Sequence, residues 1–234
     1  MFRRILIANR GEVAARVMRT CRALGLDSVA ISTDADMGLQ FLEGATTVVN
    51  IGDNRAYLDI DRVIAAGREA GCSAVHPGWG FLSENATFAA RCESVGITFI
   101  GPASGTMRRM ADKAQARSVM ASLGVATIPG SDGVLDSIED TLQVARSLGY
   151  PVLIKPVSGG GGRGMRRVDS DDDVAAAFTE GSAEALAAFG DGRMYAEKLI
   201  ENGRHIEFQV IGDGKRVQIL GERECSIQRR HQKL

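Results

Sequence analysis

The chain has 234 residues, of which 44% are hydrophobic and 24% charged, values typical of soluble globular proteins. This length predicts one large domain or two small ones, and the composition excludes a disordered chain, a collagen-like chain and a membrane bundle. Lysine and arginine total 28 against 29 acidic residues, and a formal net charge of −1 argues against a protein that coats nucleic acid.

The first hundred residues alternate between strand and helix patterns. Short apolar runs predict buried strands, and apolar residues three or four positions apart predict helices that end at glycines. The predicted strands are Ile5–Ala8, Ser28–Ser32, Thr47–Ile51, Ala74–His76 and Ile97–Ile100. The predicted helices are Glu12–Leu24, Ile60–Ala70 and a third that Ser83 caps and that runs to about Ser94. This alternation predicts a parallel sheet with helices on both faces.

The second half has the pattern of an α+β domain with antiparallel strands. Its predicted helices are Ser104–Ala111, Asp112–Leu123, a helix that Ser137 opens and Gly149 ends, and about Asp171–Phe189. Its predicted strands are Pro151–Pro156, Met165–Val168, Met194–Lys198, Glu207–Ile211 and Arg216–Leu220. The last two are joined through Gly212-Asp213-Gly214, a sequence typical of a β-hairpin turn.

The cysteines and the N-terminus indicate the cellular setting. Cys21, Cys72, Cys92 and Cys225 form no Cys-x-x-Cys pair, which argues against a zinc site and a disulfide framework. The apolar run after the first arginines is too short for a signal peptide, and no run reaches the ~18 apolar residues of a membrane span. We therefore expect a soluble, cytoplasmic protein with no membrane partner and no nucleic-acid partner.

The strongest local signal is a glycine-rich loop that follows a lysine. Lys155 stands in a predicted strand, and the loop Ser158–Gly164 after it carries few side chains. Glycines let backbone N–H groups approach phosphate oxygens, and the lysine adds a positive charge. The loop is neither a P-loop nor the Gly-x-Gly-x-x-Gly fingerprint. We interpret it as a phosphate-binding loop rather than a linker.

Four further features can each be interpreted as purely structural when taken alone. Glu222–Lys233 is a charged stretch typical of a solvated tail, and it has no aromatic residue to stack on bases. His76–Phe81, which carries the single tryptophan, is either a packed turn or part of a ligand site. His205 alone is more typical of a structural histidine, and Cys225 has no nearby base to make it a nucleophile.

Five motifs occur in the order in which biotin carboxylases have them, and the whole chain resembles that family. They are Ile7–Glu12, His76–Asn85, Phe99–Pro102, the glycine loop ending in Arg163-Gly164-Met165, and Glu222–Lys233. The resemblance implies a Rossmann-like domain over residues 1–111. It implies the N-terminal part of an α+β ATP-grasp domain over residues 112–234, with a glycine-rich lid at about 131–203.

The resemblance also implies roles for individual residues. Lys113 and Lys155 would contact the phosphates of ATP, and Gly161 and Gly162 would offer backbone contacts from the lid. The adenine-binding hinge would comprise Glu197, Lys198, Leu199 and Ile200, with Glu197 accepting a hydrogen bond from the exocyclic amine. His205, Gln228 and His231 would line the nucleotide site, and Lys233 would meet bicarbonate. The resemblance therefore favours a role in the site for His205 and for the charged stretch, over a structural histidine and a solvated tail.

The implied reaction uses ATP to activate bicarbonate as carboxyphosphate, which carboxylates biotin on a carrier protein or domain. It would be the first half-reaction of a carboxylase for acetyl-CoA, propionyl-CoA, pyruvate or urea, and an acyl-CoA carboxylase is the expected one. The implied partners are ATP, Mg²⁺ or Mn²⁺, bicarbonate, the biotin carrier, a carboxyltransferase and a second copy of the chain. Family members continue past the position of Leu234, and the metal-holding glutamates are expected in that part. We therefore expect this stretch alone to be inactive and to bind ATP weakly.

Three stretches depart from the family pattern. Asp36-Met37-Gly38 replaces a usual Arg-Asp pair, Gln40–Ala45 is shortened, and Pro156-Val157 stands where small residues are usual. The alternative hypothesis is a truncated, non-catalytic nucleotide-binding module. Another ATP-grasp ligase, such as a carbamoyl-phosphate synthetase, is disfavoured by the Gln228–Lys233 signature.

Overall fold

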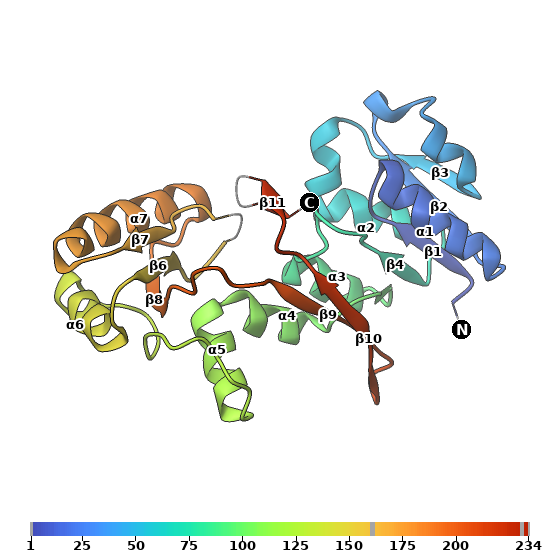
Figure 1. The fold of residues 1–234 in the computed structure, drawn as a ribbon. Helices are drawn as coiled ribbons and strands as arrows, with labels where there is room; N and C mark the ends of the chain where they lie inside the picture. Colours follow the sequence, from blue (N-terminus) through green and yellow to red (C-terminus); the bar gives the residue numbers. More distant parts are fainter. Residues whose placement is uncertain (1, 160–161, 230–231, 234) are drawn as a thin grey trace. The chain divides into compact units, whose positions relative to one another are not determined.

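The computed structural model describes residues 2–159, 162–229 and 232–233. The chain divides into two compact units, Met1–Arg109 and Met110–Leu234 (Figure 1). Within the described ranges, no helix combines the length and the apolar character needed to cross a membrane.

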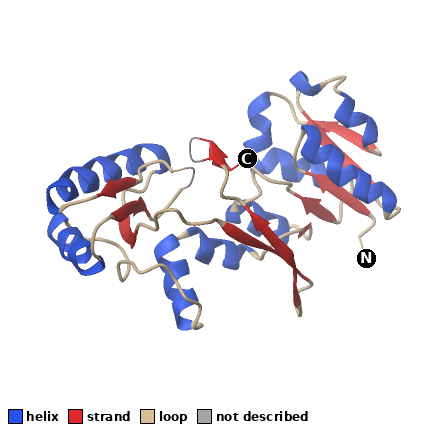
Figure 2. Ribbon diagram, viewed as in Figure 1, coloured by secondary structure: helices blue, strands red, loops and turns tan. Residues whose placement is uncertain are grey.

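The first unit is an α/β unit around a five-stranded parallel sheet with the order β3-β2-β1-β4-β5 (Figure 2). Its strands are β1 (Arg4–Ile7), β2 (Asp27–Ser32), β3 (Thr47–Asn50), β4 (Ala74–His76) and β5 (Thr98–Phe99). Its helices are α1 (Gly11–Ala23), α2 (Ile60–Glu69) and α3 (Ala86–Ser94), and α4 (Ser104–Ala111) follows β5. The predicted parallel sheet is confirmed.

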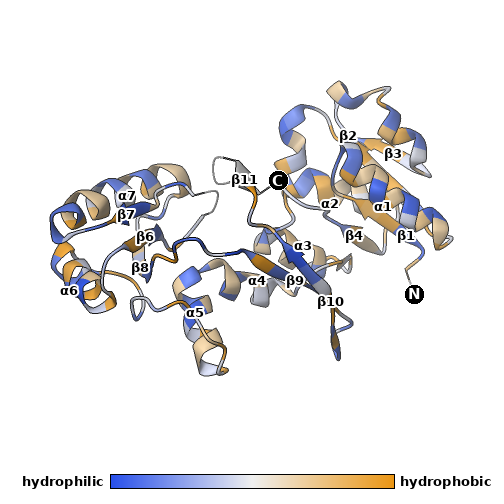
Figure 3. Ribbon diagram, in the orientation of Figure 1, coloured by the Kyte–Doolittle hydropathy of each residue, from blue (hydrophilic) through white to orange (hydrophobic). Residues whose placement is uncertain are grey.

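Other elements pack on both faces of this sheet. Successive side chains of a strand point to opposite faces, so each strand contributes to both packing layers. In β1, Ile7 packs with residues of α1, whereas Leu6 packs in the larger core cluster that α2 and α3 contribute to. A strand buried on both sides needs apolar residues throughout. The strands of this sheet are accordingly among the hydrophobic segments in Figure 3.

The start of α3 differs from the prediction. Asn85, not Ser83, is the N-cap residue, and its side chain accepts a hydrogen bond from the Phe88 backbone N–H at 2.9 Å. Ser83 lies in the preceding turn, where its backbone N–H donates to the Gly80 carbonyl at 2.9 Å. Serine and asparagine cap helices about equally well, so the local sequence could not decide between them.

Short 3-10 helices form where no element was predicted. They are η1 (Asp34–Asp36), η2 (Gln40–Gly44) and η3 (Asn54–Leu58). The stretch Gln40–Ala45 folds mainly as η2, which lies against α1 through Phe41 and Leu42. Such short helices carry no periodic signal that a sequence pattern can detect.

The turn after β4 is fixed by hydrogen bonds, although the Trp79 side chain is 69% exposed. The buried Asn9 side chain donates to the carbonyls of Pro77 at 2.8 Å and Trp79 at 2.9 Å. His76 Nδ1 accepts from the Gly78 N–H at 3.0 Å, and burial lowers the pKa of His76. The structure shows a hydrogen-bonded turn at His76–Phe81, and a role of this turn in a ligand site stays a prediction.

The second unit contains a three-stranded antiparallel sheet with the order β7-β6-β8, as predicted for the second half. The strands are β6 (Val152–Pro156), β7 (Arg166–Val168) and β8 (Met194–Lys198). The helices are α5 (Lys113–Ser122), α6 (Ile138–Leu148) and α7 (Val174–Phe189), which the short η4 (Asp171–Asp173) precedes. Side chains of α6 and α7 pack on one face of this sheet.

A hairpin and a shorter strand pair complete the second unit. The hairpin strands β9 (Ile206–Gly212) and β10 (Val217–Glu224) are longer than predicted, and their register shifts between Ile219 and Glu222. Apolar side chains of the hairpin are exposed, with Phe208 at 59% and Ile219 at 64%. Gln228–Arg229 (β11) pairs with Gln232–Lys233 (β12), so the charged stretch is not simply a solvated tail.

Candidate nucleotide-binding site

A cavity of about 190 Å³ lies in the second unit where β6 meets the glycine loop. Its lining residues are Lys113, Lys155, Pro156, Ser158, Gly159, Gly162, Arg163, Met165 and Tyr195. The structure thus brings together two lysines and one glycine that the resemblance selected. Three of the described lining residues are basic and none is acidic, so the cavity favours an anionic ligand.

Lys155 reaches the cavity because of the register between β6 and β8. Lys155 pairs with Tyr195, and Leu153 pairs with Glu197, so these side chains share one face of the sheet. The alternate residues Ile154 and Ala196 are fully buried on the other face, in the core with α6 and α7. The face that is free of this core therefore carries the charged groups.

Glu197 is a buried carboxylate held between two cations. Lys155 Nζ donates to its Oε2, and Arg117 Nη1 donates to its Oε1 at 3.0 Å. Its side chain is 9% exposed, and a carboxylate so buried needs such partners. The hydrogen bond from the adenine amine that was predicted for Glu197 stays a prediction.

Lys113 enters the cavity from the first turn of α5. Asp112 caps this helix, since its side chain accepts from the Gln115 backbone N–H at 2.9 Å. The Lys113 ammonium donates to the Gly159 carbonyl and so ties α5 to the start of the glycine loop. Burial and the positive charge of Lys155 lower the pKa of Lys113, whereas the negative charge of Glu197 raises it.

The start of the glycine loop is fixed by its neighbours. Ser158 Oγ donates to Asp191 at 2.6 Å, and hydrogen bonds from Arg193 and Ser158 hold the pKa of Asp191 well below its usual range. Gly159 has a φ of +91°, and a Cβ there would lie 2.4 Å from the Phe189 ring. Only glycine fits this position, which is a close approach of backbone to ring.

Arg117 and Tyr195 were missed by the sequence reasoning. Arg117 follows Lys113 by four residues, one helical turn, so its position on the same helix face was a usable signal. Tyr195 lines the cavity, and its pKa is raised by burial and by the charge of Glu197. Its place beside Lys155 depends on strand register, which has no comparable local signal.

Comparison with known proteins identifies both units. Residues 1–107 match the model of the biotin carboxylase N-terminal domain, and residues 112–234 match the ATP-binding domain described for the carbamoyl-phosphate synthase L chain. The biotin carboxylase of Pseudomonas aeruginosa is 47% identical over 239 residues, which cover all of this chain and 53% of that protein. The chain belongs to the biotin carboxylase family.

Solved structures of the family share this fold. The Campylobacter jejuni biotin carboxylase, crystallised as a βγ-ATP complex, has a TM-score of 0.96 and 47% identity. The biotin carboxylase domain dimer of Hydrogenobacter thermophilus 2-oxoglutarate carboxylase, with MgADP, ADP and bicarbonate, has a TM-score of 0.94 and 46% identity. Each match covers 100% of this chain, against 53% and 52% of the two solved chains. The chain thus spans about half the length of these biotin carboxylases.

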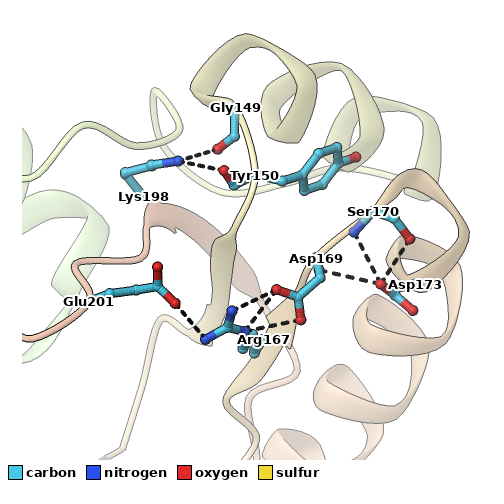
Figure 4. Close-up of polar contacts among 8 residues, drawn as sticks. All are labelled: Gly149, Tyr150, Arg167, Asp169, Ser170, Asp173, Lys198 and Glu201. Carbon is cyan, nitrogen blue, oxygen red and sulfur yellow. Dashed lines mark hydrogen bonds and ion pairs between the residues drawn. The ribbon is translucent and has the colours of Figure 1, made fainter.

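The hinge expected for a biotin carboxylase comprises the last two residues of β8 and the two residues after it. The Lys198 ammonium faces the end of α6, where it donates to the carbonyls of Gly149 at 2.7 Å and Tyr150 at 2.9 Å (Figure 4). The Leu199 backbone N–H donates to the Pro151 carbonyl at 3.2 Å, and Ile200 is exposed. The adenine contacts assigned to this hinge stay predictions.

An ion-pair chain links the hinge to β7. Arg167 Nη1 donates to Glu201 at 3.0 Å, and Arg167 Nε donates to Asp169 at 2.9 Å (Figure 4). Glu201 directly follows the hinge, while Arg167 and Asp169 lie in and just after β7. The lid expected of a biotin carboxylase, at about 131–203, also stays a prediction.

Five predicted site residues remain, namely Gly161, His205, Gln228, His231 and Lys233. The backbone of His205 is held by Ser226 Oγ, which accepts from its N–H at 2.9 Å, and by the Cys225 N–H, which donates to its carbonyl at 2.7 Å. Gln228 pairs with Lys233 in the backbone register of β11 and β12. Gly161 and His231 lie outside the described residues. Their roles stay predictions.

Proposed function

We propose that this chain acts in the ATP-dependent carboxylation of biotin, and that the cavity of the second unit binds the phosphates of ATP. The observation that carries the proposal is the convergence of Lys113, Lys155 and the start of the glycine loop on one cavity. A cavity lined by three basic side chains and by loop backbone suits a polyphosphate. Because the chain belongs to the biotin carboxylase family, we interpret this anion site as the site for the phosphates of ATP.

The chemistry fits these residue types. An oxygen of bicarbonate would attack the γ-phosphorus of ATP, ADP would leave, and carboxyphosphate would form. Negative charge on the transferring oxygens is stabilised by lysines and backbone N–H groups that are already in place. The carboxyl group would then pass from carboxyphosphate to a ureido nitrogen of biotin, which loses its proton, and inorganic phosphate would leave and take up that proton. Lys233 is proposed to hold bicarbonate for the first step.

A divalent metal has no assigned ligand in this chain. Among the described residues, no three His, Cys, Asp or Glu side chains gather closely enough to hold a metal ion. For the adenine, we propose the hinge Glu197–Ile200, with His205, Gln228 and His231 along the nucleotide.

The proposed partners are the biotin carrier, a carboxyltransferase and a second copy of the chain, in the cytoplasm. We propose an acyl-CoA, acetyl-CoA or propionyl-CoA, as the final acceptor. Sequence identity does not separate the acceptors, since the 2-oxoglutarate carboxylase domain is 46% identical. The carboxyltransferase would select the acceptor. Pull-down of that partner, followed by an assay of carboxyl transfer to each acyl-CoA, tests the proposed acceptor.

A chimera tests the proposed reaction. Residues 1–234 replace the corresponding half of the Pseudomonas aeruginosa relative, and phosphate release from ATP is measured with and without bicarbonate and biotin. We expect release that depends on both, and loss of this release in the Lys155→Ala chimera. A folded chimera that binds ATP without bicarbonate-dependent cleavage would instead support a non-catalytic nucleotide-binding module.

A further inference from the structure

Arg117 connects three parts of the second unit next to the cavity. From α5, its Nη1 donates to the Ile128 carbonyl at 2.6 Å and to Glu197 Oε1 on β8 at 3.0 Å. The side chain is only 18% exposed. A guanidinium that is largely shielded from water and has several hydrogen-bond acceptors is held in one geometry. Its planar group is already rigid, so it loses little conformational freedom when these hydrogen bonds form.

The backbone leaves room for this guanidinium. A Cβ on Gly130 would lie 2.7 Å from Arg117 Nη2 and 2.5 Å from the Ala196 carbonyl oxygen. Gly130 pairs with Glu197 across an isolated β-bridge, so the same glycine lies against both members of the ion pair. Arg117 therefore occupies a space that the fold keeps open for it.

Glu197 passes this constraint on to Lys155. Its two oxygens accept from different cations, Arg117 on Oε1 and Lys155 on Oε2. An ammonium has three donors, so Lys155 keeps two for a ligand while Glu197 fixes its position. Arg117 also balances the charge of Glu197, which leaves the charge of Lys155 uncompensated within this triad and available to an anion.

We propose that Arg117 is a positioning residue of the nucleotide site, which neutralises and orients Glu197 so that Lys155 meets the phosphates at the cavity wall. The identity of the ligand rests on the function proposed above. Without Arg117, Lys155 and Glu197 form a neutral pair, and the attraction for a polyanion falls. A long lysine side chain that is held in place also loses less entropy when it binds.

The first measurement is ATP titration of the full chain. We expect Arg117→Met to weaken ATP binding by about tenfold, a coupling of the size found between contacting charged residues. Arg117→Lys keeps the charge but loses the planar guanidinium, so its affinity should fall by less than that of Arg117→Met. Arg117→Met combined with Glu197→Gln should bind ATP better than Arg117→Met alone, because the unbalanced carboxylate is gone. A merely structural arginine would not show this recovery.

The second measurement needs no nucleotide. The chain has five lysines, Lys113, Lys155, Lys198, Lys215 and Lys233, so selective ¹³C labelling at lysine Cε gives few NMR signals. Lys155→Arg assigns the Lys155 signal. Arg117→Met should shift that signal and leave the signal of Lys215 in place. The matched control is Arg146→Met, which removes an arginine from an exposed pair with Asp171 on the same unit and should leave Lys155 unmoved.

The outcomes separate the two proposals. If the wild type does not bind ATP, the proposed function fails, and the Lys155 signal still decides the role of Arg117. Arg117→Met with wild-type affinity and an unmoved Lys155 signal overturns the positioning role. If Arg117→Met does not fold, Arg117→Lys decides, since a tenfold loss of affinity in that folded variant contradicts charge compensation by residue 117.

Discussion

Replacing Asp36 by asparagine should destabilise the first unit through one buried hydrogen-bond network. The carboxylate is fully buried and accepts from the Thr33 N–H at 3.0 Å, Thr33 Oγ1 at 2.6 Å, Tyr57 OH at 2.7 Å and Arg10 Nη2 at 2.5 Å. Thr33 and Asp36 follow β2, and Arg10 follows β1, so this one side chain connects two strand ends.

The magnitude follows from the two oxygens. Oδ2 accepts from Thr33 and Tyr57, so the amide oxygen of asparagine can take its place, whereas an NH₂ group then faces Arg10. The charge-assisted bond to Arg10 is lost, at about 1.5–3 kcal/mol, and the remaining bonds weaken because their acceptor is neutral. Arg10 can turn to water, since its side chain is 46% exposed. We expect a loss of about 2–4 kcal/mol in the free energy of unfolding.

Amide hydrogen exchange of β1 and β2, followed by mass spectrometry, measures this loss. A change of 2–4 kcal/mol corresponds to about 30- to 1000-fold faster exchange. The control is Asp34→Asn, an exposed neighbour that accepts from Asn50 at 2.9 Å and should change stability by less than about 0.5 kcal/mol. If Asp36→Asn exchanges within threefold of the wild type, or if both variants lose equally, the network does not act as argued.

The same carboxylate predicts a pH dependence. Burial raises the pKa of Asp36, but hydrogen bonds from Thr33, Tyr57 and Arg10 outweigh burial, so the pKa lies below its ordinary value. A lowered folded-state pKa contributes stability above the unfolded value of about 3.9 and loses it as the pH falls through the folded value. The wild type should therefore lose this stability in acid, and Asp36→Asn should lack that part of the pH dependence.

Three further predictions concern the second unit. Lys155→Ala should weaken ATP binding at least about fivefold because it removes a charge-assisted contact, whereas Lys233→Ala should barely change it; calorimetric titration of both variants checks this, and the reverse order would contradict the assigned roles. Glu197→Gln should lower the pKa of Lys113 further, and Lys155→Ala should raise it, since those are the signs of the two charges; NMR titration of the lysine signals shows whether either shift has the wrong sign. Phe208→Asp should reduce concentration-dependent association, because Phe208 belongs to an exposed apolar hairpin surface. Light scattering over a range of protein concentrations measures this association, and scattering unchanged from the wild type would argue against the prediction.

The strands and the longer helices of the first unit, and the place of the glycine-rich loop, could be predicted from the sequence alone. The apolar runs of β1 and β2 and the glycines after α1 and α2 are local features, and the strand–helix alternation admits few arrangements other than a parallel sheet. Lys155 lies in β6, directly before the glycine loop, as its sequence context predicted. The motif order was also sufficient to recognise the family. Where two local signals were equal, as for Ser83 and Asn85, the sequence could not choose.

The contacts of Arg117 and Tyr195 at the cavity could be seen only in the folded structure. Arg117 and Glu197 are 80 positions apart, and their contact depends on how α5 packs beside β8. Lys198 was assigned to the hinge by its neighbours in sequence, yet its ammonium contacts the end of α6, because successive residues of a strand point to opposite faces. Charge pairing of this kind arises from register and packing, so it becomes visible only when strands and helices that are distant in sequence lie side by side.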